Sequence, residues 1–148
     1  MRNHISLITK LDDELVSHFS LHEFENREGW CLLHQTVVKG LEQTRRDLCK
    51  LGRAVYIIIT CSTRTTEWNN ELGQIYGFTD EGGTVSRTSK HLPKYGGIAV
   101  DFKAVYADDN TLVPTSVVGS IARLYFDYVK SDYVDGHIHA DQRRMIDD

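Results

Sequence analysis

The chain has 148 residues, of which 41% are hydrophobic and 26% are charged, and its formal net charge is −4. These values indicate one globular domain that is large enough to bury a core. The basic residues do not gather into one run, so nucleic acid is not a favoured partner. Residues 1–16 carry polar or charged side chains every few positions, which argues against a signal peptide and a membrane span. We therefore expect synthesis in the cytosol and no membrane partner.

The first half of the chain predicts two helices and one strand. Apolar residues recur at helical spacing over residues 32–51, and Gly52 follows as a stop. Residues 54–60, AVYIIIT, are almost wholly apolar and predict a strand that is covered on both faces, near the centre of a sheet. Residues 66–76 predict a second helix, and the glycine- and hydroxyl-rich residues 78–89 predict a surface loop.

The second half predicts two further strands and one further helix. Residues 97–107 read as a strand, residues 114–130 as a helix with helical apolar spacing, and residues 133–141 as a short strand. Helices and strands therefore interleave, which predicts a single compact domain of the α+β class.

The three cysteines, Cys31, Cys49 and Cys61, are an odd number at wide spacing. They indicate neither a disulfide framework nor a C-x-x-C zinc site, so we expect reduced and mostly packed thiols. No histidine and acid are patterned around Cys61, which favours a packed residue at the end of a strand over a nucleophile.

One carboxylate falls inside an apolar run. Asp101 follows Ile98, Ala99 and Val100 in the sequence GIAVDF. An ionised carboxylate there would cost several kcal/mol unless a positive charge meets it. A salt bridge to one of the C-terminal arginines, Arg143 or Arg144, would supply that charge, and so would a metal ion.

The histidines of the sequence could hold such a metal ion. His137 and His139 are two residues apart, so on a strand they share a face about 6–7 Å apart. A catalytic zinc site commonly takes three protein ligands from histidine and carboxylate and leaves a fourth position to water. His91, Asp101 and one of the final pair would make that set, and spacing alone leaves the salt bridge and the metal site open.

Four fragments, in chain order, resemble the zinc-dependent peptidase M15 family. The sequences S-K-H-L-…-G-I-A-V-D-F and H-I-H-A-D resemble its S-x-H-x-x-G-x-A-x-D and H-x-D signatures, and FSLHEF and IITCSTRTTEWNNEL resemble two further stretches. These peptidases include D-Ala-D-Ala carboxypeptidases, peptidoglycan endopeptidases and phage endolysins. The resemblance implies one such domain over residues 1–148, with a small, mostly antiparallel sheet packed with helices, the hedgehog-like zinc peptidase fold.

The resemblance also implies a site. His91, Asp101 and His139 correspond to the three zinc ligands of the family. Arg64 corresponds to the arginine that binds a substrate carboxylate or carbonyl, a task that suits the fixed fork of a guanidinium. Ser89 corresponds to the serine of the motif and is expected to form hydrogen bonds or shape the loop beside the substrate.

The general base has two candidates. Family members place an acid shortly before the last ligand, which favours Asp135, although Gly136 stands where several relatives carry the acid. His137 would then assist at the developing oxyanion or exchange roles with His139 as ligand. Asp141 is expected to orient an imidazole.

The sequence departs from the family pattern at two places. Nine residues rather than six separate His91 from Asp101, so residues 92–96, LPKYG, are expected to bulge. Cys61, Ser62 and Thr63 replace the usual Ser-Gly-Tyr. The leading hypothesis is a zinc peptidase that cleaves peptidoglycan peptides, as a cell-wall lysin or, equally, a cytosolic dipeptidase. The alternative is a non-catalytic binding or structural module, such as a virion component, with the same fold.

Overall fold

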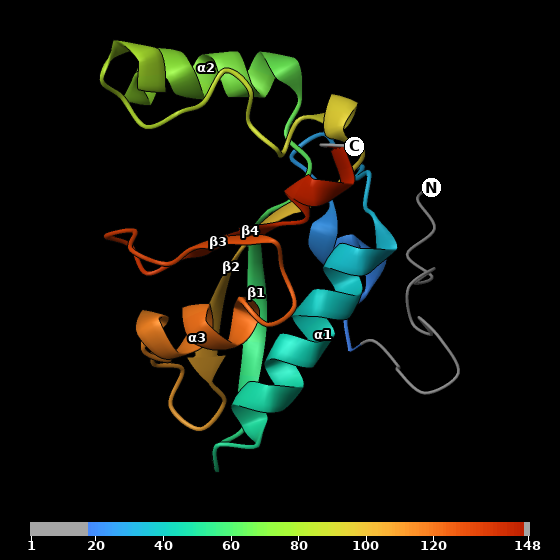
Figure 1. Ribbon diagram of the computed structural model, residues 1–148, viewed down its shortest axis with the longest axis vertical. Helices are drawn as coiled ribbons and strands as arrows, with labels where there is room; N and C mark the ends of the chain where they lie inside the picture. The colour runs from blue at the N-terminus through green and yellow to red at the C-terminus, as the bar shows by residue number, and fades with distance from the viewer. Residues whose placement is uncertain (1–17, 147–148) are drawn as a thin grey trace.

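The computed structural model describes residues 18–146, and Figure 1 shows a central sheet with helices on either side. The segment on which the signal-peptide argument rests, residues 1–16, lies outside this range. Within the described range, no helix is both long and apolar enough to cross a membrane. The predicted α+β class is confirmed: the described residues form three α-helices and four antiparallel strands.

The sheet has the strand order β1-β2-β4-β3, so its two middle strands come from distant parts of the chain. The strands are β1 (Val55–Cys61), β2 (Ala99–Tyr106), β3 (Tyr128–Lys130) and β4 (Ile138–Asp141). Side chains alternate between the two faces of a strand. Val100 and Phe102 on β2, and Ile138 and Ala140 on β4, belong to the buried core. Asp101 and His139 lie between them and therefore point to the opposite face.

Two helices cover the apolar face of the sheet. Helix α1 (Gln35–Cys49) contacts β1 and β2, and α3 (Thr115–Ala122) contacts β3 and β4. Helix α1 begins where the ring of His34 accepts a hydrogen bond from the amide of Thr36 at 3.2 Å. Its fully buried residues Val37, Val38 and Leu41 face the sheet, and burial of each such side chain contributes about 1.5–3 kcal/mol.

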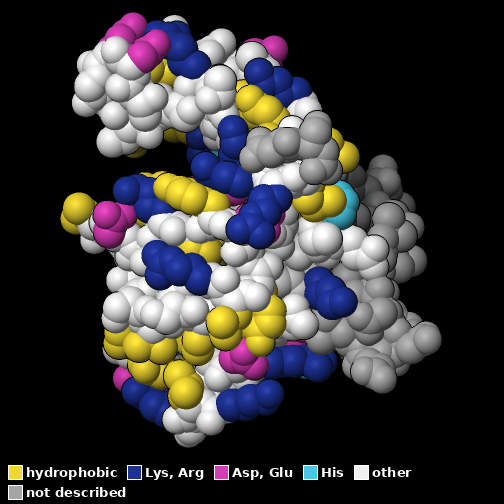
Figure 2. Space-filling model, in the orientation of Figure 1, with side chains coloured by type: hydrophobic (Ala, Val, Ile, Leu, Met, Phe, Trp, Pro, Cys, Tyr) yellow, Lys and Arg dark blue, Asp and Glu magenta, His cyan; other side chains and the backbone are white. Residues whose placement is uncertain are grey.

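The third helix stands apart from this layer. Helix α2 (Thr66–Tyr76) begins where the hydroxyl of Thr65 accepts a hydrogen bond from the amide of Trp68, and it ends at Gly77, whose φ of 81° favours glycine. Short 3-10 turns link the elements around it: η1 (Leu21–Phe24), η2 (Thr79–Glu81), η3 (Pro93–Tyr95) and η4 (Arg143–Ile146). Figure 2 shows the molecule hollowed between the α2 part and the sheet, with Lys and Arg side chains near the hollow.

The prediction that residues 54–60 form a central strand covered on both faces is wrong. Strand β1 pairs only with β2 in the described sheet, and its side chains alternate between buried and exposed. Tyr56 and Ile58 are 39% and 44% exposed, because α1 covers only the face that carries Val55 and Ile57. The strand that is buried on both faces is β2, which carries Asp101.

The bounds predicted for the C-terminal elements are also wrong. The helix expected over residues 114–130 ends at Ala122, and Tyr128–Lys130 pairs with β4 instead. Leu124 is 70% exposed, so the helical spacing of apolar residues continues past the point where the core needs it. The strand expected over residues 133–141 begins only at Ile138, after a turn in which Gly136 has a φ of 83°.

The helix expected over residues 32–51 begins at Gln35 and ends at Cys49.

Candidate metal centre

Asp101 lies at the middle of a row of residues that crosses the sheet. In the antiparallel register, Asp101 is directly opposite His139 on β4 and opposite Cys61 on β1. Residues that are directly opposite in an antiparallel pair share a face, with side chains about 5 Å apart. The pairing of β1, β2 and β4 therefore places a thiol, a carboxylate and an imidazole side by side, on the face that looks towards the hollow.

Two histidines converge on this carboxylate. Asp101 Oδ1 lies 3.1 Å from His91 Nε2 and 3.0 Å from His139 Nδ1, and the two ring nitrogens are 3.3 Å apart. Ligand atoms around a tetrahedral ion with bonds of about 2.0–2.1 Å lie roughly 3.3 Å from one another. The three residues that the family resemblance assigns to zinc thus present their donor atoms at separations that suit one small cation.

The outward ring nitrogens of both histidines are held in place. The Nδ1 atom of His91 lies 2.7 Å from the carbonyl oxygen of Ser62, and the Nε2 atom of His139 lies 2.7 Å from Asp141 Oδ2. Arg143 in turn donates two side-chain hydrogen bonds to Asp141, at 2.9 and 2.8 Å. An acceptor on the second nitrogen fixes the tautomer of a metal-binding imidazole and makes it a better donor. Asp141 therefore occupies the orienting position expected for it.

The electrostatics make Asp101 a permanent anion. Burial opposes ionisation of this carboxyl, but the neighbouring His91 and His139 outweigh burial and hold its pKa well below the ordinary range. Burial likewise opposes a charge on His91, but Asp101 and Cys61 outweigh it and raise the pKa of His91 to about 10. For His139, too, hydrogen bonds to Asp101 and Asp141 outweigh burial and raise the pKa. A cation bound to the same atoms would supply the positive charge instead.

The alternative partners for Asp101 lie elsewhere. Arg143 binds Asp141, as described, and the backbone amide of Arg144 donates to Asp127 at 3.0 Å. The side-chain ion pairs of Asp101 are those with His91, His139 and His137. The structure therefore places three imidazoles, rather than a guanidinium, around the buried carboxylate.

Cys61 joins this cluster, which the sequence analysis did not foresee. One ligand atom from each of Cys61, His91 and Asp101 lies within 4.8 Å of the other two, so these residues could hold a metal ion. Burial would raise the pKa of the Cys61 thiol, but the positive charges of His91 and Arg64 outweigh burial and lower it. The cysteines are free thiols, as expected.

A shift of register determines the face on which Cys61 lies. Ile59 is opposite Phe102 on the core face, whereas Cys61 is opposite the next residue, Asp101. Two residues apart on a regular strand, Ile59 and Cys61 would share a face. The irregularity between them, which also includes Thr60, redirects the sulfur to the face of the candidate metal centre. Irregularities of this kind leave no clear mark on the sequence.

The two candidates for the general base lie at the edge of the cluster and contact each other. Asp135 accepts hydrogen bonds at 3.1 Å from the backbone amide of His137 and at 2.5 Å from the Nδ1 side of its ring. The His137 Nε2 atom is 3.9 Å from Asp101 Oδ2, whereas the Asp135 side chain is 60% exposed. Tyr133 stacks on the His137 ring with centroids 3.9 Å apart. His137 is thus the one that faces the metal ligands, and Asp135 lies behind it.

The two residues expected to bind substrate, Arg64 and Ser89, contact each other beside Cys61. The Arg64 guanidinium donates to Asn69 Oδ1 at 3.0 Å and to Ser89 Oγ at 3.4 Å, and it also lies 3.7 Å from Cys61 Sγ. Its Nε atom is buried without a hydrogen-bond partner. Ser89 Oγ also accepts from the backbone amide of His91 at 3.3 Å. Ser89 therefore shapes the loop that carries a candidate ligand, and Asn69 is a further residue that positions Arg64.

The loop between His91 and Asp101 absorbs the additional residues. Pro93–Tyr95 form the 3-10 turn η3, and Gly96 and Gly97 follow with φ values of 82° and 76°. A side chain on Gly97 would meet the backbone of Leu32 at 2.3 Å. The expected bulge of LPKYG is thus a tight turn that lets the chain fold back between His91 and β2. A comparison of the sequence with protein-family models and with curated proteins found no match to either.

Proposed function

We propose that this chain is a zinc-dependent peptidase that hydrolyses peptide bonds of peptidoglycan. One observation carries the proposal: donor atoms of His91, Asp101 and His139 converge within 3.0–3.3 Å of one another, with the second nitrogen of each imidazole held by an acceptor. Two imidazoles and one carboxylate are a usual ligand set of catalytic zinc, in which a fourth position serves water or substrate. The resemblance of the sequence to M15 peptidases supports the same reaction and the same class of substrate.

The residues around the ligands have complementary tasks. When bound, a zinc ion polarises the scissile carbonyl and lowers the pKa of water to about 7. His137 accepts the proton of the attacking water at Nε2 and later delivers it to the leaving amine, while Asp135 holds the opposite side of the ring. This reverses the order of preference that the sequence suggested, because His137 Nε2 is 3.9 Å from Asp101 whereas the Asp135 side chain is 60% exposed.

Arg64 binds the substrate. Its guanidinium faces the cluster from the α2 side and offers several donors in one plane, which suits a terminal carboxylate or a peptide carbonyl. Tyr133 flanks the same space. Burial and the charge of Asp101 raise the pKa of Tyr133 to about 12, so its phenol remains a hydrogen-bond donor at neutral pH. Together these groups can hold a short peptide across the metal ligands.

One observation favours a second candidate function. Cys61 stands within the group that could hold the ion, and a site with four protein ligands is usually structural. The chain would then be a non-catalytic metal-binding module, for instance a virion component. Measurement of turnover separates the two functions, since both require a bound ion.

The test combines elemental analysis with digestion of purified peptidoglycan. We expect about one zinc per chain and the release of new amino and carboxyl termini. Both should be lost in His91→Ala and retained in His22→Ala, whose side chain is 63% exposed. Release of a single terminal amino acid would identify a carboxypeptidase, and release of larger fragments an endopeptidase. Zinc without cleavage would favour the binding module, and the absence of bound metal would refute both functions.

A further inference from the structure

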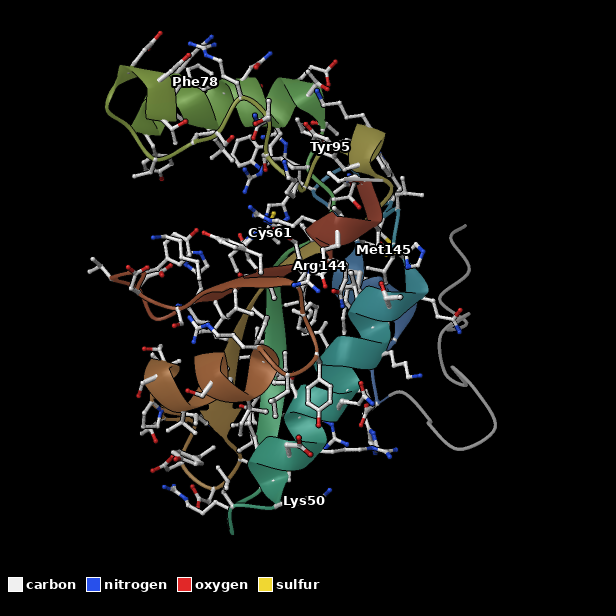
Figure 3. All side chains as sticks on the ribbon, viewed as in Figure 1. Lys50, Cys61, Phe78, Tyr95, Arg144 and Met145 are labelled. Atoms are coloured by element: carbon white, nitrogen blue, oxygen red, sulfur yellow. The ribbon has the colours of Figure 1, made fainter. Side chains whose placement is uncertain are left out.

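The register of the sheet gives Asp101 a possible metal ligand on each side. His139 is opposite Asp101 on β4, and Cys61 is opposite it on β1. The side chains of these two neighbours therefore emerge on the same face as the carboxylate. Figure 3 shows Cys61 between α2 and the sheet, where the candidate metal centre lies.

The position of the sulfur suits coordination. The ligand atoms of Cys61, His91 and Asp101 lie within 4.8 Å of one another, and Asp101 Oδ1 is also 3.0 Å from His139 Nδ1. A zinc–sulfur bond is longer than a zinc–nitrogen bond, about 2.3 Å against about 2.0–2.1 Å, so a sulfur ligand stands further from its neighbours. The sulfur thus lies beside His91 and Asp101, and both of these residues also contact His139.

The Cys61 sulfur also has a partner that stabilises an anion. The Nη2 atom of Arg64 donates to Cys61 Sγ at 3.7 Å. Groups that donate hydrogen bonds to a metal ligand orient it and adjust its affinity for the ion. Arg64 therefore contacts both the candidate ligand and the space assigned to the substrate.

We infer that Cys61 supplies a fourth ligand to the metal ion held by His91, Asp101 and His139. This inference rests on the proposed metal centre. Four protein ligands close the site, so the sulfur must leave before a water molecule or a substrate carbonyl takes its place. A soft thiolate also selects zinc over magnesium, calcium and manganese, which prefer oxygen ligands. Cys61 thereby sets which metal the site accepts and when the site is open.

Cobalt(II) substitution tests the inference by a readout that does not depend on activity. Zinc is a d¹⁰ ion and gives no visible spectrum, whereas cobalt(II) shows visible bands in any site and a near-ultraviolet charge-transfer band when sulfur binds. We expect both bands in the wild-type protein. Cys61→Ser should keep the visible bands and lose the charge-transfer band. Cys31→Ser, which replaces a half-buried thiol elsewhere, should keep both.

The outcomes separate the two proposals. Visible cobalt bands without a charge-transfer band in the wild-type protein would overturn the role of Cys61 and leave the metal centre intact. No cobalt or zinc binding at all would overturn the metal centre, and with it the role of Cys61.

A second measurement uses only the unmodified chain. Iodoacetamide labelling of Cys61, followed by mass spectrometry, should proceed to completion in the metal-free protein and be blocked when zinc is bound. Labelling of Cys31 should be the same in both states. Equal labelling of Cys61 with and without bound zinc would contradict the inference.

Discussion

Two of the buried carboxylates, Glu42 and Asp101, differ in the side chains around them. Glu42 on α1 has a side chain with 0% exposure; Arg45 and Arg46 approach it to 2.7 and 3.0 Å, and His18 to 3.0 Å. Asp101 on β2 is instead approached by His91 and His139. A guanidinium is permanently charged and cannot bind a metal ion, whereas a neutral imidazole is the commonest metal ligand. The two guanidiniums at Glu42, rather than a difference in burial, distinguish this structural ion pair from the candidate metal ligand Asp101.

Replacement of Asp101 should have the largest effect. Asp101→Asn removes the charge to which both imidazoles converge, so we expect loss of bound zinc and a fall of peptidoglycan hydrolysis to the level without enzyme. Asp132→Asn, at a side chain that is 77% exposed, is the matched control. Full zinc content and normal turnover in Asp101→Asn would place Asp101 in the same class as Glu42.

Replacement of His137 should affect catalysis without affecting the metal. His137→Ala should lower turnover by about 10²–10⁴-fold, the range for loss of a general base, with the zinc content unchanged. Elemental analysis and peptidoglycan digestion on the same preparation check both parts. Loss of zinc in this variant would instead make His137 a ligand.

Replacement of Asp141 should weaken zinc binding, because Asp141 holds the second ring nitrogen of His139. Asp141→Asn keeps the shape but removes the charge that accepts from His139 Nε2. We expect a zinc Kd larger by about 10–100-fold, measured by competition with a chelator. An unchanged Kd would show that Asp141 serves only its ion pair with Arg143.

Replacement of Glu42 should affect stability and leave the metal alone. Glu42→Gln breaks charge-assisted hydrogen bonds to Arg45 and Arg46, and it should lower the free energy of unfolding by about 2–3 kcal/mol. Thermal unfolding with and without zinc provides the measurement. The variant should have a lower Tm but the same rise of Tm on zinc addition as the wild-type protein. If zinc no longer raised the Tm of the variant, the environments of Glu42 and Asp101 would be energetically coupled.

The smallest predicted effect is on the pH dependence of stability, and it concerns Glu42. Burial alone would raise the pKa of Glu42, but hydrogen bonds from Arg45 and His18 outweigh burial and lower it. The unfolded chain therefore binds this proton more readily than the folded one. The stabilisation is complete above the unfolded pKa of about 4.3 and is lost as the pH falls through the lower folded pKa. The difference in stability between wild type and Glu42→Gln should thus be constant near neutrality and shrink in acid. A difference that does not change with pH would contradict this account.

The sequence predicted the class of the fold and the order of most elements, because apolar periodicity reports which side of an element is buried. It failed at β1, whose apolar residues indicated burial on both faces although Tyr56 and Ile58 are partly exposed. It also extended the last helix to Lys130, since Tyr128 fits the helical spacing even though its backbone pairs with β4. Strand pairing depends on residues that are distant in sequence, and periodicity does not report it.

The residues of the candidate site were likewise predicted only in part. The resemblance to the family's motifs named His91, Asp101 and His139, and the structure brings them together. The contribution of Cys61 was missed, because the register shift that redirects it is a property of the pairing between β1 and β2. The sequence also could not show whether Asp135 or His137 faces Asp101, because the turn at Gly136 determines which of the two side chains points inward.

The position of the register shift has a consequence for how this molecule can vary. β1 is an edge strand of the described sheet, so one residue more or fewer near Thr60 changes its pairing with β2 alone among the strands. The pairing between β2 and β4, which sets Asp101 against His139, is independent of it. A short insertion or deletion in β1 can therefore exchange the sulfur for another side chain while Asp101 and His139 keep their pairing, but it would also shift Ser62, whose carbonyl contacts His91. The four donors thus fall into two pairs: Asp101 and His139 are set by pairing inside the sheet, whereas Cys61 and His91 depend on the end of β1 and the residues that follow it.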